Sequence, residues 1–140
     1  MIYAKDCLAK FGEPNADFER KWMVLWQNDI GGAIPKKIYC NKLLLPKLQQ
    51  ALQKIKEAGY LDMIVTWDGC FNVRKSRTSK SYSLHAWGIA FDINAATNQL
   101  GHESTQSLAI VKIFNEVGLD FGGLWKLRDP MHWQLKTLDG

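Results

Sequence analysis

The sequence of 140 residues contains no long apolar run, whereas a membrane helix needs about 18–20 consecutive apolar residues. Apolar runs such as 43–45 end after a few residues. Its first residues lack a basic stretch followed by an apolar one, so we expect no secretory signal peptide and synthesis in the cytoplasm. No repeat, low-complexity segment or long linker is visible. A length of 140 residues predicts one domain, 1–140, which we expect to be a monomer without an integral membrane segment.

Cysteine is scarce and widely spaced. The three cysteines are Cys7, Cys40 and Cys70, and no two of them form a C-x-x-C pair. This excludes a disulfide framework and an all-cysteine zinc site. We expect reduced thiols that are buried as small apolar side chains.

The net charge is +4 and the isoelectric point is near 9.0. A basic protein is attracted to polyanions, which include nucleic acid, a membrane surface and the bacterial cell wall. Charge alone does not choose among them. The basic clusters, at 36–37 and 74–80, are short enough to be ordinary solvated loops.

Apolar periodicity and short β-rich segments predict interspersed helices and strands. The predicted helices are 2–10, 42–58 and 105–117. The predicted strands are 21–27, 62–67, 88–94 and 131–135. Asn41 and Ser104 are the expected N-caps of the two longer helices, which Gly59 and Gly118 should end. Because helices and strands do not alternate regularly, we expect a small α+β domain with a mainly antiparallel sheet and helices packed against it.

Candidate chemistry begins in the predicted strand 88–94. Large apolar side chains alternate there with small ones, so one face points into the core and the other carries Asp92 beside residues too small to obstruct it. His85 lies in the turn that precedes this strand. Such a turn can fold the imidazole back over the face that carries the carboxylate.

A second cluster lies near the C-terminus, where His132 and Gln134 share one strand face and Asp129 precedes His132 by three residues. If the two strands are neighbours, His85, Asp92 and His132 converge. Two imidazoles and one carboxylate can hold zinc with an open fourth position, where the metal activates water, and Asp129 would be free to take a proton. The spacing is also compatible with a hydrogen-bonded structural pair and with Asp129 as a turn cap.

These residues form a compound motif, S-x-H-x-x-G-x-A-x-D at 83–92 followed by D-x-x-H-W at 129–133. The motif resembles that of the zinc D-alanyl-D-alanine carboxypeptidase family, peptidase family M15, which includes phage L-alanyl-D-glutamate endopeptidases. The flanking segments W-D-G-C-F-N-V-R at 67–74 and G-G-L-W at 122–125 look like a phage-type branch. The resemblance covers about 64–135 and implies a hedgehog/DD-peptidase-like fold.

The resemblance also implies a role for individual residues. His85, Asp92 and His132 would be the ligands of one Zn²⁺ per chain. Asp129 would act as general base and then as general acid, although many relatives have the longer Glu at this position. Arg74 would bind a substrate carboxylate or the developing oxyanion, to which a guanidinium is suited.

Two further residues are expected at the substrate site. Ser83 would orient the loop or a ligand through a hydrogen bond, and Trp125 would line the substrate groove.

The resulting hypothesis is a zinc-dependent peptidase that cleaves an amide in the stem peptide of bacterial peptidoglycan, with no nucleic acid as partner. The bond most favoured is L-alanyl-D-glutamate, which fits a phage endolysin that reaches the wall through a phage-encoded pore. One alternative is a D-alanyl-D-alanine carboxypeptidase. Another, from a different class, is a non-catalytic module that binds the wall or nucleic acid, for which the basic loop 74–80 is the evidence.

Overall fold

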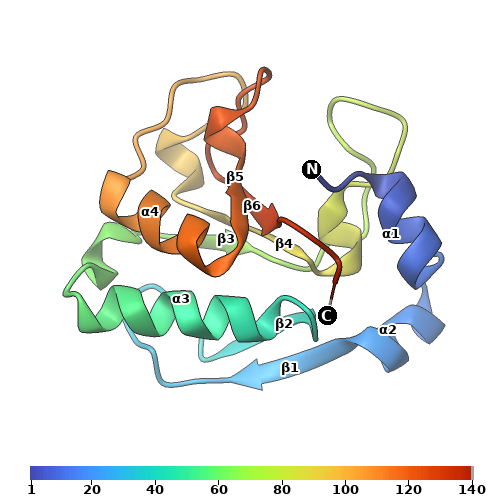
Figure 1. Ribbon diagram of the computed structural model, residues 1–140, viewed down its shortest axis with the longest axis horizontal. Coiled ribbons are helices and arrows are strands. Elements are labelled where there is room, and N and C mark those ends of the chain that lie inside the picture. Colours follow the sequence, from blue (N-terminus) through green and yellow to red (C-terminus); the bar gives the residue numbers. More distant parts are fainter. Residues whose placement is uncertain (140) are drawn as a thin grey trace.

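The computed structural model describes residues 1–139, which form four α-helices and two antiparallel sheets (Figure 1). The helices are α1 (Ala4–Phe11), α2 (Ala16–Trp22), α3 (Leu45–Glu57) and α4 (Leu108–Val117). The strands are β1 (Met23–Gln27), β2 (Lys37–Asn41), β3 (Trp67–Gly69), β4 (Ala90–Ile93), β5 (Leu119–Phe121) and β6 (His132–Leu135). The α+β prediction is confirmed.

The larger sheet has the strand order β3-β4-β6-β5, and α3 and α4 lie together on one side of it (Figure 1). In the β4–β6 ladder, Phe91 stands opposite Trp133 and Asp92 opposite His132. Phe91 and Trp133 are fully buried, and both rings contact Phe114 of α4. Because successive side chains point to opposite faces of a strand, the same register sends Asp92 and His132 to the face away from these helices.

The N-terminal third forms a smaller layer, in which β1 and β2 pair as an antiparallel hairpin. Asn41, at the end of β2, is fully buried, and its side-chain amide donates to the Trp87 carbonyl at 2.9 Å. The Asn41 backbone N–H donates to the Gly88 carbonyl at 3.0 Å. These two hydrogen bonds tie the small sheet to the segment that leads into β4.

Several predicted strands differ from the observed ones. The prediction of a strand at 62–67 is wrong, because Leu61–Met63 is a 3-10 helix and β3 begins only at Trp67. The strand predicted at 21–27 begins at Met23, since α2 continues to Trp22. Helix α2 and strands β2 and β5 were not predicted, and all three are at most seven residues long.

The predicted helices are present with shifted starts. Helix α3 begins at Leu45, and the Asn41 side chain accepts from the Leu43 N–H instead of capping the helix. Helix α4 is capped by Ser107, three residues after the predicted cap. The predicted stop at Gly118 is confirmed, with the left-handed φ of +104° that favours glycine.

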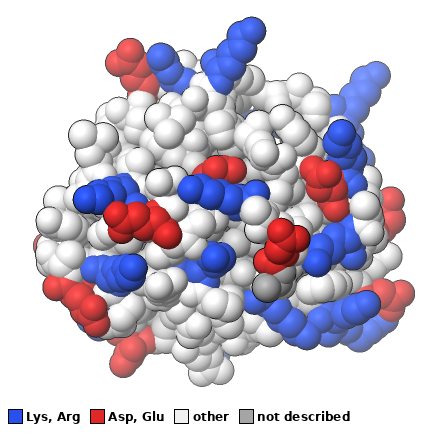
Figure 2. Space-filling model, viewed as in Figure 1, with Lys and Arg blue, Asp and Glu red and all other residues white. Residues whose placement is uncertain are grey.

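All three cysteines lie among the described residues, where they are buried and form no disulfide. Burial raises the pKa of the Cys7 and Cys40 thiols to about 12, so both are uncharged at neutral pH. Within residues 1–139, no helix combines the length and apolarity needed to cross a membrane. On the face seen in Figure 2, most basic and acidic side chains are interspersed, and several basic ones gather along the lower right edge.

Gly88 provides a test of the packing at this junction. Its φ is +66°, and a Cβ there would lie 2.7 Å from the Met23 Cε and 3.0 Å from the Asn41 backbone nitrogen. Gly59, the residue after the C-cap of α3, also has a positive φ, +81°, but open space around it. Gly59→Ala should cost about 1 kcal/mol of unfolding free energy from backbone strain. Gly88→Ala should cost about 1–3 kcal/mol more from overpacking. Urea unfolding measures both, and equal losses would contradict this packing.

Candidate functional site

The candidate site lies where β4, β6 and a short 3-10 helix meet. Asp92 and His132 face each other across the ladder, and His85 comes from the 3-10 helix Leu84–Trp87 just before β4. Ser83 caps that helix, because its hydroxyl oxygen accepts from the His85 N–H at 3.3 Å. The predicted turn therefore folds the His85 ring back toward Asp92.

The three predicted metal ligands converge. His85 Nε2 lies 3.2 Å from one Asp92 carboxylate oxygen, and His132 Nδ1 lies 3.5 Å from the other. One potential ligand atom from each residue can be chosen so that all three lie within 4.8 Å of one another. A tetrahedral zinc site with bonds of about 2.0–2.1 Å separates its ligand atoms by about 3.3 Å, which is close to the two observed spacings.

The hydrogen bonds around His85 show which ring nitrogen is available to a cation. His85 Nδ1 lies 2.7 Å from the Cys70 carbonyl oxygen. A carbonyl only accepts, so Nδ1 carries the hydrogen and Nε2 faces Asp92. Both His85 Nε2 and Asp92 Oδ1 are buried without a hydrogen-bond partner. Because buried polar atoms are normally satisfied, these two fit a bound cation.

The charges of the cluster support the same conclusion. Burial by itself raises the pKa of Asp92, but the His132 and His85 imidazoles outweigh it and hold that pKa below its usual range. Burial alone lowers the pKa of His132, while the nearby Asp92 and Asp129 carboxylates raise it overall. Asp92 is therefore ionised, and the cluster favours positive charge between its members, from a proton or from a metal cation.

Asp129 lies at the edge of the cluster. Its carboxylate is 4.0 Å from His132 Nδ1, and the turn that carries it is closed by the Asp129 N–H donating to the Gly122 carbonyl at 2.9 Å. Burial raises the pKa of Asp129, and the nearby Asp92 charge adds to the rise, against a lowering by His132. A carboxylate with a raised pKa that is not one of the three convergent ligands suits proton transfer.

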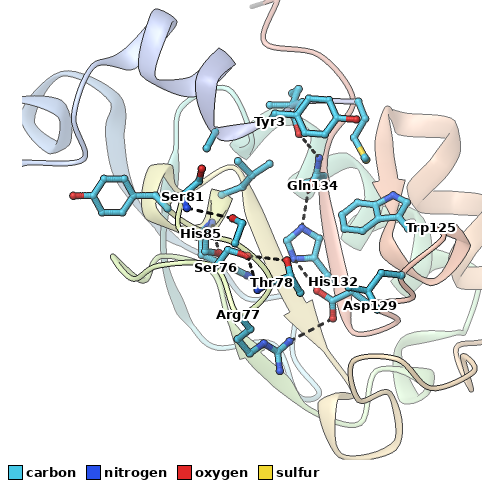
Figure 3. Close-up of a pocket in the computed structure, with 18 of the residues that line it drawn as sticks. Tyr3, Ser76, Arg77, Thr78, Ser81, His85, Trp125, Asp129, His132 and Gln134 are labelled. Carbon is cyan, nitrogen blue, oxygen red and sulfur yellow. Dashed lines mark hydrogen bonds and ion pairs between the residues drawn. The ribbon is translucent and has the colours of Figure 1, made fainter.

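A cavity of about 740 Å³ opens above these residues (Figure 3). Three segments form its walls, 1–5, 74–85 and 125–129. His132 and Asp129 lie between the wall that carries Trp125 and the loop that carries Arg77 (Figure 3). These residues thus lie inside a hollow of the size that binds small organic ligands.

The other predicted residues also line this cavity. The Trp125 ring lies 5.3 Å from the His132 ring, measured between centroids. Arg74 reaches the cavity wall, but the one hydrogen bond of its side chain within the described residues runs to the Lys75 carbonyl. Ser83 lines the cavity and supports the backbone of His85.

Sequence reasoning missed two contacts of the cluster. The guanidinium of Arg77 lies 3.6 Å from the Asp129 carboxylate, although only Arg74 was assigned a role. Gln134 Oε1 lies 2.9 Å from His132 Nε2. The signal for Gln134 was its place two residues after His132 on the same strand face, whereas nothing in the sequence distinguishes Arg77 from its basic neighbours.

Comparison with known proteins gives one family. The family model described as D-alanyl-D-alanine carboxypeptidase matches residues 76–135. No curated protein and no solved structure gave a significant match. The matched segment includes the three convergent residues and Asp129, while Arg74 and the rest of the segment 64–75 lie outside it.

The matched family consists of peptidases that act on peptidoglycan and are in general zinc-dependent. The match and the His85, Asp92 and His132 cluster agree, since the residues that converge in space are those on which the resemblance rests. The match over residues 76–135 supports the M15 peptidase family, whose members hydrolyse peptidoglycan peptides.

Proposed function

We propose that this protein is a single-domain zinc peptidase in which His85, Asp92 and His132 hold one Zn²⁺. The observation that carries the proposal is the convergence of the three side chains, with buried atoms that lack hydrogen-bond partners, at a cavity that also contains Asp129. Two imidazoles and a carboxylate form a ligand set that leaves a fourth position open, as catalytic zinc sites do.

Zinc held here would supply a Lewis acid that activates water and polarises the scissile carbonyl. Asp129 provides the proton transfer. Its carboxylate takes a proton from the attacking water and delivers it to the amine when the C–N bond breaks, so that it ends in its original state. Burial and the raised pKa of Asp129 favour this exchange, because they bring its two protonation states closer in free energy.

The cavity walls provide the groups that would hold the substrate. We assign Arg74 to a substrate carboxylate or to the developing oxyanion, since its permanent charge and forked donors suit either. Trp125 offers a flat apolar surface next to His132. Ser83 acts indirectly, by fixing the 3-10 helix that carries His85.

The bond that we propose is the amide between L-alanine and D-glutamate. A cavity of about 740 Å³ lies in the upper part of the range of small-molecule pockets, which leaves room for residues on both sides of a scissile bond. The flanking segments at 67–74 and 122–125 resemble the phage-type branch. Because cleavage of this bond opens the peptidoglycan network, the corresponding role is that of a phage endolysin, which would reach the wall through a phage-encoded pore.

The alternative is a D-alanyl-D-alanine carboxypeptidase, which the description of the matched family favours. That reaction removes a terminal D-alanine and leaves the network intact. A non-catalytic wall- or nucleic-acid-binding module is disfavoured, because binding alone does not require the buried Asp129 carboxylate beside three convergent side chains that could hold a metal.

The bond can be identified by mass spectrometry of the fragments released from purified peptidoglycan by the zinc-loaded protein. We expect new D-glutamate amino termini. Loss of a single D-alanine, with the peptidoglycan network intact, would contradict the endopeptidase assignment and show a carboxypeptidase. No zinc-dependent change in the peptidoglycan would contradict both.

The metal ligands are tested by His132→Ala. The variant removes one of two imidazole ligands, so its zinc affinity should fall by at least about 100-fold, which metal analysis after dialysis measures as loss of stoichiometric zinc. His102→Ala is the matched control, because His102 is exposed in a loop outside the cluster. Stoichiometric zinc in His132→Ala would refute the ligand assignment.

The role of Asp129 is tested by Asp129→Ala and the isosteric Asp129→Asn. Both should bind zinc and fold, but their kcat should fall by about 10²–10⁴-fold, because neither side chain can accept the proton. Asp120→Asn, on β5 and outside the cavity, is the control and should keep wild-type turnover. Wild-type kcat in Asp129→Asn would exclude Asp129 as the base.

A further inference from the structure

We infer that Gln134 is a positioning residue, which links the backbone carbonyl of Ile2 to His132 and thereby fixes the ring nitrogen that His132 presents to the metal. The inference rests on the proposed zinc site. It makes the N-terminal segment, residues 1–3, part of that site. Figure 3 shows Gln134 between this segment and the His132 ring.

The direction of the two hydrogen bonds follows from the Ile2 carbonyl. Gln134 Nε2 lies 3.3 Å from the Ile2 oxygen, and a carbonyl oxygen only accepts. The amide nitrogen must therefore face Ile2, which turns Gln134 Oε1 toward His132. Oε1 lies 2.9 Å from His132 Nε2 and also only accepts, so Nε2 carries the hydrogen.

This assignment leaves His132 Nδ1 free of hydrogen when the ring is neutral. Nδ1 is the nitrogen that lies 3.5 Å from Asp92 and 4.0 Å from Asp129. A flipped Gln134 amide would place its NH₂ against Nε2 and move the hydrogen of a neutral ring to Nδ1, where it would block a metal. The Ile2 carbonyl disfavours that flip, because the flipped amide oxygen would face the carbonyl oxygen.

Burial makes this arrangement costly to replace. The exposed fractions of Ile2, His132 and Gln134 are 7%, 6% and 2%. Water therefore has little access to replace a lost hydrogen-bond partner. A buried amide or imidazole that lacks a hydrogen-bond partner lowers the stability of the protein. Gln134 stands opposite Ala90 in the ladder, whose small side chain leaves space for the glutamine.

The N-terminal segment is held independently of Gln134. The Tyr3 backbone N–H donates to the Asp6 carboxylate at 2.8 Å, and the Asp6 N–H donates back to the Tyr3 carbonyl at 3.0 Å. This reciprocal pair fixes the entry into α1 and so the position of the preceding Ile2 carbonyl. His85 obtains the same kind of support from the Cys70 carbonyl directly, without an intervening side chain.

The test compares Gln134→Leu with Gln134→Glu in the full chain, with zinc affinity measured by competition against a chelator. Leucine removes the acceptor for His132, so zinc should bind about 10–100-fold more weakly. Glutamate keeps an acceptor for His132 and loses only the donor to Ile2, so it should restore most of the affinity at lower stability. Gln106→Leu is the control, because Gln106 is also buried and its amide donates to the Ile93 and Pro130 carbonyls without contact to a histidine ring. Its zinc affinity should match the wild type.

Equal zinc affinity of folded Gln134→Leu and wild type would overturn the inference while leaving the zinc site intact. Absence of zinc binding by the wild type would instead contradict the proposed function.

A second measurement does not depend on any variant. Imidazole nitrogen–proton NMR of the wild-type protein, at a pH where the rings are neutral, should show the His132 hydrogen on Nε2. A hydrogen on Nδ1 would overturn the inference, even if the leucine variant fails to fold.

Discussion

The site depends on one electrostatic constraint, a buried carboxylate between two imidazoles. Asp92 is ionised, and the His85 nitrogen that faces it cannot carry the hydrogen of the neutral ring, because the Cys70 carbonyl holds that hydrogen on the opposite side. A buried charge without compensation costs several kcal/mol, so the cluster requires a cation or protons among its members. Metal binding to such a cluster is coupled to folding, since the unfolded chain does not hold the ligands together.

The same strand register builds both the core and the site. Phe91 and Trp133 pack against α4, and their neighbours Asp92 and His132 meet on the opposite face. A slip by one residue would bury the carboxylate in the aromatic core and expose the rings, so the hydrophobic packing fixes the register that the chemistry needs. The 3-10 helix before β4 adds His85, and the left-handed turn at Gly88 directs the chain into the strand.

The alternation of residues in the two strands predicted the faces that carry Asp92 and His132, because a period of two is a local property of the sequence, but their convergence depended on the two strands being neighbours. The strand predicted at 62–67 was wrong, since its apolar residues occupy a 3-10 helix and a turn whose backbone is held by Asn94 from a distant segment. The contact between Gln134 and Ile2 joins positions 132 residues apart. Contacts between such distant positions produce no periodic pattern in the sequence. The hydrogen bond between Gln134 and Ile2 therefore could not be predicted from the sequence.

The convergent side chains and the cavity walls come from different parts of the fold. Strands β4 and β6, with the adjoining 3-10 helix, hold the three convergent side chains, whereas the cavity walls are the segments 1–5, 74–85 and 125–129. Arg77 reaches from one wall to the Asp129 carboxylate, at 3.6 Å, so this wall is also connected to the residues around the cluster. The wall at 1–5 is connected to His132, because Gln134 forms hydrogen bonds with both Ile2 and His132. The wall at 125–129 also has a hydrogen bond to His132, since the His132 backbone N–H donates to the Asp129 carbonyl at 3.0 Å. A change in the wall at 1–5 would therefore act on the His132 ring through the Gln134 side chain, whereas a change at 125–129 would act on the His132 backbone.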